Sequence, residues 1–258
     1  MSGTPAGSKA VSGWIVTILL AAAFVFLVVD MGLWKAALHF LFPATDQILY
    51  PGAPLSVLVA EHVELVAISS FLALAIGIPL GVFVTRESGR DFRNVTNDLT
   101  SLGQTVPPVA VLVLAVPLLG FGFKPTVFAL FLYSVLPIVR NTVAGLEAVP
   151  SDIVEAARGM GMTPPQILFR VELPLAVRVI MAGIRISVVI NIGTATVGAV
   201  IGAGGLGAPI IAGLVNENPS FVLEGAAAAG FLALLFDQIL ARIEATLTPG
   251  IANAPQKA

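Results

Sequence analysis

The sequence contains no cysteine, and only two histidines, two tyrosines and two tryptophans among its 258 residues. Without cysteine, the chain has no disulfide framework, no thiolate metal site and no cysteine nucleophile. His39 and His62 are too few for a histidine-based metal cluster, so we expect no metal site. Charged residues make up only 11% of the chain, whereas a soluble domain has about 25%.

Hydrophobic residues are abundant instead. They make up 57% of the chain, and the mean hydropathy is +0.98. A soluble domain has about 45–50% apolar residues. The surplus apolar surface needs lipid, so the composition predicts an all-α, polytopic membrane helix bundle. A formal net charge of −2 gives no indication of nucleic-acid binding.

Apolar stretches of roughly 20 residues are candidates for membrane-spanning helices. The run from Trp14 to Val29 is too long for a signal peptide and lacks a small-x-small cleavage pattern, so we interpret it as a retained span. Between the first two spans, residues 41–62 are interpreted as an interfacial loop that leads into a short helix. About six spans are predicted, at 14–33, 63–84, 100–119, 125–140, 180–200 and 221–241.

The distribution of basic residues predicts the orientation. Alternate segments hold 11 of the 13 Lys and Arg residues, and the segment 201–220 has none. Cytoplasmic loops are the ones that retain Lys and Arg. We therefore expect both termini, the 85–99 loop and the 141–179 loop to face the cytoplasm.

The 141–179 loop contains several helix boundary signals. Asp152 followed by Glu155 resembles a capping box, and Gly161 is placed to end that helix in a left-handed turn. The segment 163–166, Thr-Pro-Pro-Gln, predicts a second helix that begins at Thr163. We expect this helix to end near Leu173, where Pro174 bends the chain toward the next span. An alternative interpretation is an amphipathic linker that lies on the membrane.

The spacing in this loop resembles the EAA motif of ABC-importer permeases. Glu-Ala-Ala at 155–157 is followed after three residues by Gly161, and nine residues later by Val171-x-Leu173-Pro174. The one departure is Val in place of Ile at 171. The resemblance implies that the 150–174 loop couples to an ATPase subunit through Glu155, Ala156, Ala157, Gly159, Gly161, Leu173 and Pro174.

Three further strings, QTVPPVAVLVLAVPLLGFG, LYSVLPIVRNTVAGL and SVVINIGTATVGAVIGAGGLGAPIIAGL, resemble permeases that import osmoprotectants such as glycine betaine, choline or carnitine. The similarity covers residues 60–245. It implies a type I ABC importer (MetI-like) permease fold in the bacterial inner membrane. It also implies an N-terminal region (1–60) with a cytoplasmic tail, the first span and an external loop, then a permease core (61–245) and a cytoplasmic tail (246–258).

The same resemblance implies the partners. These are two ABC ATPase subunits that bind ATP and Mg²⁺, a second permease subunit of the same or a sibling chain, and an extracytoplasmic solute-binding protein. This chain has no G-x-x-x-x-G-K-[ST] sequence, so it is expected to be a transport subunit and not an enzyme, with no cofactor of its own. A high-affinity aromatic cage for a quaternary amine is not expected from two Trp and two Tyr, so selection is assigned to the binding protein.

Residues 202–207 read Gly-Ala-Gly-Gly-Leu-Gly, which matches G-x-G-x-x-G literally. A dinucleotide fingerprint requires a preceding strand, but here a membrane span precedes the glycines. We instead expect a bend followed by a short helix, 208–214, at the outer mouth of the pathway. The resemblance places an external gate here, with Gly204, Gly205 and Gly207.

Polar residues inside spans are candidates for the translocation pathway, or alternatively for hydrogen bonds between helices. Acids near the ends of the last span, Glu224 and Asp237, are poorly placed for a proton relay, and Arg185 is expected to extend to the cytoplasmic surface. The pathway candidates are Gln104, Thr105, Tyr133, Ser134, Asn191, Thr194 and Thr196.

Three alternatives stay open from the residues alone. They are an ABC permease for another small solute, an amino acid such as methionine among them, a proton-coupled secondary transporter, and a membrane scaffold that transports nothing.

Overall fold

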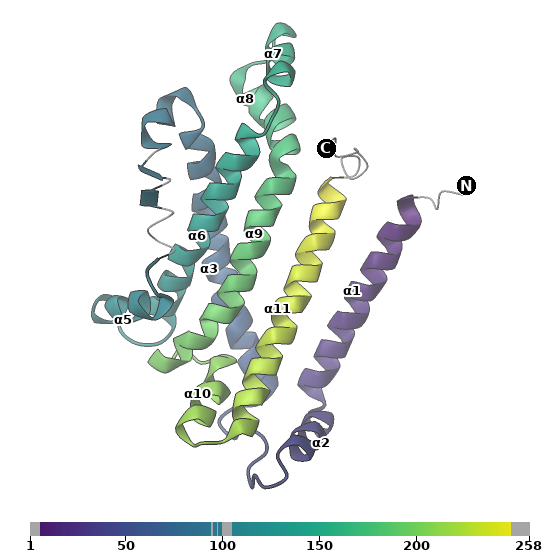
Figure 1. The fold of residues 1–258 in the computed structure, drawn as a ribbon, viewed down its shortest axis with the longest axis vertical. Coiled ribbons are helices and arrows are strands. Elements are labelled where there is room, and N and C mark those ends of the chain that lie inside the picture. The colour runs from purple at the N-terminus through teal and green to yellow at the C-terminus, as the bar shows by residue number, and fades with distance from the viewer. Residues whose placement is uncertain (1–5, 94, 97, 100–104, 249–258) are drawn as a thin grey trace.

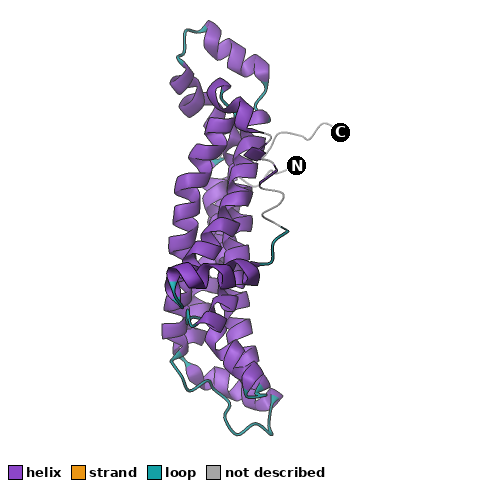
Figure 2. Ribbon diagram, turned by 90° about the vertical axis from the view of Figure 1, so that its left-hand side faces the viewer, coloured by secondary structure: helices purple, strands orange, loops and turns teal. Residues whose placement is uncertain are grey.

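The computed structural model describes residues 6–248 except 94, 97 and 100–104, and this part of the chain is helical without any strand (Figures 1 and 2). The long helices run roughly parallel to one axis and form an elongated bundle. The elements are α1 (Ala6–Val29), α2 (Met31–Leu41), α3 (Leu55–Val84), η1 (Glu87–Phe92), α5 (Pro108–Leu119), α6 (Phe123–Glu147), α7 (Ser151–Gly159), α8 (Pro164–Ile167), the π-helical turn η2 (Leu168–Glu172), α9 (Leu173–Ala195), η3 (Thr196–Ile201), α10 (Gly207–Val215) and α11 (Pro219–Leu247).

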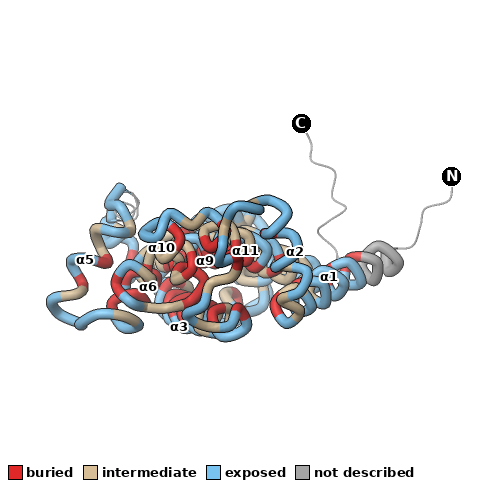
Figure 3. Tube along the Cα trace, turned by 90° about the horizontal axis from the view of Figure 1, so that it is seen from below, coloured by how far each residue is buried: buried red, intermediate tan, exposed pale blue. Residues whose placement is uncertain are grey.

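Helices α3, α6, α9 and α11 form the centre of the bundle, with α6 packed against both α3 and α9. Buried positions concentrate in these helices, whereas α1 and α5 lie on opposite flanks (Figure 3). Gly77 and Gly81 make a G-x-x-x-G pair on α3 that allows α6 to approach closely. A Cβ on Gly81 would lie 2.6 Å from Thr142 Cβ, so the small residues are required at this crossing.

The two ends of the bundle differ. Helices α7 and α8 project at one end, and α2 and α10 lie at the other (Figure 1). The first turns of α1 and the last turns of α11 point toward the end that carries α7. The described start of α1 and end of α11 therefore lie on the same side of the bundle as the 150–174 hairpin.

Four described helical segments are long and apolar enough to cross a membrane: Leu55–Val84, Phe123–Glu147, Pro164–Ile201 and Pro219–Leu247. A fifth candidate is the bent pair of α1 and α2, whose axes differ by 78°. The predicted third span, 100–119, corresponds to α5. This apolar helix has only 12 residues and begins at Pro108. Residues 100–104 of that predicted span lie outside the described part of the chain.

The predicted first span, 14–33, was wrong at its end. Helix α1 stops at Val29, and Asp30 starts a new helix by accepting a 2.9 Å hydrogen bond at Oδ1 from Gly32 N–H. An aspartate at an N-cap favours a helix start, and here it starts α2 in a different direction.

The interpretation of 41–62 as a loop and short helix was also wrong. Helix α3 is continuous from Leu55, so the polar residues Glu61, His62 and Glu64 belong to the spanning helix itself. Pro54, in extended conformation, precedes its first residue and defines the boundary.

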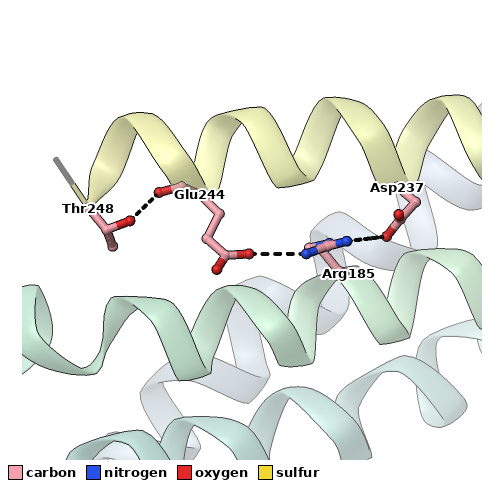
Figure 4. Close-up of polar contacts among 4 residues, drawn as sticks. All are labelled: Arg185, Asp237, Glu244 and Thr248. Carbon is pink, nitrogen blue, oxygen red and sulfur yellow. Dashed lines mark hydrogen bonds and ion pairs between the residues drawn. The ribbon is translucent and has the colours of Figure 1, made fainter. Parts of the chain in front are cut away.

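Helices α9 and α11 are joined by an ionic cluster (Figure 4). Arg185 donates from Nη2 to Asp237 Oδ1 at 2.8 Å and from Nη1 to Glu244 Oε2 at 3.2 Å. Arg185 therefore bonds to α11 rather than extending alone to the surface. Asp237 is occupied by this bond in the described structure, which further weakens the idea of a proton relay.

Candidate functional site

The first half of the projecting hairpin ends in a glycine turn, as predicted. Gly161 has φ +80°, and Gly161 N–H bonds to Arg158 O at 2.9 Å while Met162 N–H bonds to Ala157 O at 3.2 Å. These two bonds make a Schellman motif, which satisfies the last carbonyl groups of α7. The start of α7 differs from the prediction, because the helix begins at Ser151 after Pro150 and Asp152 is not its cap.

The second half of the hairpin begins where predicted. Thr163 precedes α8, and Gln166 Oε1 accepts a 2.9 Å hydrogen bond from Thr163 N–H. The predicted separation of this helix from the next span is wrong. Residues Pro164–Ile201 form one continuous helical segment of 38 residues.

The π-helical turn η2 explains this continuity. Leu173 N–H bonds to Leu168 O, one residue further back than in an α-helix. Pro174 has no N–H, and in an ideal α-helix its ring would clash with the carbonyl four residues earlier. The wider turn just before Pro174 accommodates the ring without breaking the helix.

The motif residues of the hairpin differ in exposure. Ala157 is 1% exposed and anchors α7, whereas Glu155, Ala156, Gly159 and Gly161 are exposed. Leu173 is partly buried against the apolar cluster between α6 and α9, and Pro174 is exposed. Three large apolar side chains are also exposed on this hairpin, namely Ile153, Met160 and Phe169.

Two ion pairs connect the base of the hairpin to the preceding loop. Arg86, after α3, lies 2.8 Å from Glu172 in the π-helical turn, and Arg93 pairs with Glu147 at the end of α6. Sequence reasoning did not predict these contacts. The excess of Arg in 85–99 was interpreted only as an orientation signal.

The glycine loop at the opposite end is bonded to two side chains of α3. Gly205 N–H donates to Glu61 Oε2 at 2.8 Å, and Leu206 N–H donates to His62 Nδ1 at 3.3 Å. Because Nδ1 accepts, the His62 proton lies on Nε2, which donates to Ile192 O at 2.9 Å. His62 is fully buried and so joins α3, α9 and the loop at one point.

Backbone conformation and close packing both explain why glycine occupies these positions of the loop. Gly204 and Gly205 have φ of +76° and +67°, and a Cβ on Gly207 would lie 2.0 Å from Thr196 O. The loop leads directly into α10. This helix is the predicted short helix 208–214, extended by one residue at each end. The sequence signal for the missed residues Glu61 and His62 is that two adjacent polar residues stand before a long apolar run.

The predicted pathway residues are scattered. Asn191 is fully buried, and its Nδ2 donates to Ser69 Oγ at 3.1 Å and Ser70 Oγ at 3.3 Å, the geometry of a bond between helices. Tyr133 OH donates to Val106 O, and Thr196 Oγ1 donates to Gly193 O at 2.7 Å. Thr105 is exposed, Ser134 is buried, Thr194 is partly exposed, and Gln104 lies outside the described residues.

No group of three or more His, Cys, Asp or Glu side chains that would suit a metal ion occurs in the described residues. Within the described helices, His62 and Glu224 bond to backbone groups, and Arg185 pairs with Asp237 and Glu244.

Comparison with known proteins gives the family. Residues 77–253 match the model of the binding-protein-dependent transport system inner membrane component. The chain is 40% identical over 242 residues to the osmoprotectant import permease protein OsmY of Salmonella typhimurium, covering 93% of this chain and 96% of the relative. It is also 42% identical to the choline transport system permease protein OpuBB of Bacillus subtilis, covering 73% and 86%.

Solved structures support the fold. The chain matches inward-facing structures of the MetNI methionine ABC transporter with TM-scores of 0.67 and 0.64, at 24% and 26% identity. These matches cover 76% and 73% of this chain, and 99% and 94% of the solved chains. The predicted MetI-like fold and the resemblance to osmoprotectant permeases are therefore confirmed. The chain belongs to the family of binding-protein-dependent transport system inner membrane components, as a multi-pass permease subunit of an ABC importer and not an enzyme.

Proposed function

We propose that this permease subunit moves an osmoprotectant, a quaternary amine such as glycine betaine, choline or carnitine, across the inner membrane. The similarity to osmoprotectant and choline permeases over most of the chain supports this substrate class. The fold likeness to a methionine transporter keeps an amino acid as the second candidate, at the lower identity of 26%.

We propose further that the hairpin 150–174 docks on an ATPase subunit, which binds ATP and Mg²⁺. The observation that carries this proposal is the exposed hairpin surface joined without interruption to a spanning helix. Met160 and Phe169 are 75% and 67% exposed, although they are apolar. A partner protein that covers them would remove this apolar surface from water.

The continuity of Pro164–Ile201 supports a mechanical role for the hairpin. The helical segment is continuous from α8 to the outer loop, so it offers a direct route by which a displacement of α8 would reach that loop. The far end of this segment lies beside His62, which also holds the glycine loop. Movement of the hairpin is thereby linked to Gly204, Gly205 and Gly207 at the proposed external gate.

Several features follow from this proposal. The termini and the loops 85–99 and 141–179 face the cytoplasm, a second permease subunit completes the pathway, and a solute-binding protein delivers the solute from outside. Pathway contacts are assigned to Thr105, Tyr133, Thr194 and Thr196, with Gln104 and Asn191 as further candidates. The permease core is placed at 61–245, between an N-terminal region (1–60) and a C-terminal tail (246–258).

The test is reconstitution of the complete transporter in proteoliposomes with ATP on the ATPase side. Uptake of radiolabelled glycine betaine, choline, carnitine and methionine is measured in parallel. We expect ATP-dependent accumulation of at least one quaternary amine and none of methionine. Accumulation of methionine alone would assign the chain to the second candidate class.

The docking proposal has a separate test. Glu155→Lys is expected to abolish ATP-dependent uptake and co-purification of the ATPase, because it reverses the charge on the exposed face of α7. Glu87→Lys is the matched control, since Glu87 is also exposed but lies on η1 outside the hairpin. Normal uptake by the Glu155→Lys transporter would contradict the assignment of the docking surface.

A further inference from the structure

Helix α2 lies at the end of the bundle opposite α7 (Figure 1), and its surface has three sides of different character. One side faces the core, where Leu38 is 1% exposed and Met31 and Trp34 pack against the main apolar cluster. A second side carries large apolar residues that no described residue covers. They are Leu33, Phe40 and Leu41, with exposed fractions of 51%, 84% and 55%.

The third side is polar. Lys35 and His39, one helical turn apart, line an open groove with a volume of about 530 Å³. The opposite wall of this groove comes from the loop after α2, with Thr45 and Asp46. At 100° per residue, Leu33, Phe40 and Leu41 lie on one side of the helix, and Lys35 and His39 on another.

The direction of α2 separates it from the spanning helices. It turns by 78° from α1, and its N-cap Asp30 holds this turn through Gly32 N–H. The exposed apolar surface of α1 extends to Val29, which is 71% exposed, and Leu33 continues it on α2. The apolar side of α2 therefore begins four residues after an exposed apolar residue of α1, the helix that leads into it in a multi-pass membrane protein.

We infer that α2 is an interfacial helix that binds the bilayer surface. Leu33, Phe40 and Leu41 insert among the upper acyl chains, while Lys35 and His39 stay at the level of the headgroups and water. An amphipathic helix with separate apolar and basic sides lies in the plane of the interface in this manner.

The contacts of the following loop give α2 a positioning role. Tyr50 N–H donates to Glu224 Oε2 at 2.8 Å, and Ser220 Oγ donates to Ile48 O at 2.6 Å, so the loop is bonded to the first turns of α11. Lipid binding by α2 therefore sets the height of this loop and of the α11 start relative to the membrane surface.

The absence of cysteine makes a direct test available. Single cysteines are introduced at positions 33–41 of the full chain and carry a nitroxide spin label, in nanodiscs of phosphatidylethanolamine and phosphatidylglycerol. Electron paramagnetic resonance then measures collision with oxygen, which concentrates in lipid, and with a water-soluble nickel chelate. Ile18→Cys on α1, at a side chain 62% exposed, is the lipid-facing reference.

We expect a several-fold higher oxygen-to-nickel ratio for Phe40→Cys than for His39→Cys, with Phe40→Cys close to the reference. Leu38→Cys is expected to show low collision with both reagents. High nickel collision at all exposed positions would overturn the inference, because α2 would then lie in water. Low collision with both reagents at Phe40→Cys would also overturn it, because a protein partner or second copy would cover this side. The collision measurement does not depend on transport. Its failure can therefore be distinguished from a failure of the proposed substrate assignment.

Discussion

Arg86 Nη2 and Glu172 Oε2 lie 2.8 Å apart, and they connect the loop after α3 to the π-helical turn below the hairpin. The Glu172 side chain is only 12% exposed. This pair makes the proposed docking hairpin depend on a second loop that the EAA motif does not include. In the proposed docking mode, force applied to the hairpin would therefore reach α3 as well as α9.

Reversing one charge of this pair is expected to impair the proposed coupling. Glu172→Arg places two cations together and should reduce ATP-dependent uptake several-fold, with a loss of stability of about 1 kcal/mol. The double variant Arg86→Glu with Glu172→Arg restores opposite charges and should regain part of the uptake. Uptake assays on all three forms check this, and an equal defect in the double variant would show that the pair itself is not the cause.

The two glycines of the hairpin allow a matched comparison. A Cβ at Gly159 or Gly161 meets no atom within 4 Å, but only Gly161 has a positive φ, +80°. Gly161→Ala should therefore cost about 1–2 kcal/mol from backbone strain alone, and weaken ATPase co-purification. Gly159→Ala should not lower the thermal stability of the isolated chain, because alanine favours the helical conformation that this residue has in α7.

If Gly159→Ala nevertheless reduces ATPase binding, the partner must approach this glycine closely, since the chain itself leaves the space open. Pull-down of the ATPase by each variant separates the two effects. Equal behaviour of both variants in thermal unfolding would contradict the left-handed turn at Gly161.

The outer loop has a steric prediction. Gly207→Ala would bring its Cβ within 2.0 Å of Thr196 O, a backbone atom that has no freedom to turn away. We expect a loss of roughly 1–3 kcal/mol as the loop shifts. Gly193→Ala on α9 is the control because its Cβ meets nothing within 4 Å. Thermal unfolding in detergent measures both, and a stable Gly207→Ala variant would show that η3 and α10 separate easily.

The two histidines give another matched pair. His62→Ala removes the acceptor for Leu206 N–H and the donor to Ile192 O, and should cost roughly 1–3 kcal/mol. His39 is exposed on α2, so His39→Ala should change stability by less than about 0.5 kcal/mol. Protection of Leu206 N–H from hydrogen exchange should fall only in the His62 variant. Unchanged protection there would contradict the bond.

Local chemistry made part of the fold predictable. Gly161 and the segment from Thr163 to Gln166 have the composition that helix ends require, and the structure confirms both. Asp30 was misjudged because one acid inside a long apolar run changes hydropathy little, yet it caps a helix in a new direction. The early start of α3 was missed because Glu61 and His62 look unsuited to a span until their partners on the glycine loop are known.

The contacts between distant segments were beyond the sequence patterns. Spacing along the chain gives no sign that Arg185 faces Asp237, or that Asn191 faces Ser69 and Ser70. Helix packing decides these pairs. The π-helical turn was also not predicted, since Pro174 was taken as the end of a helix rather than a residue that a wider turn accommodates.

The π-helical turn η2 also determines the direction in which α8 and α7 project from the axis of α9. Each residue of an α-helix advances the chain by about 100° around its axis, and a π-helical turn contains one residue more than the α-helix it replaces. Removing one residue from Leu168–Glu172 would swing α8, and α7 with it, by about that angle around α9 while every motif residue stayed present. The EAA signature would then be intact in sequence and yet aimed away from its partner.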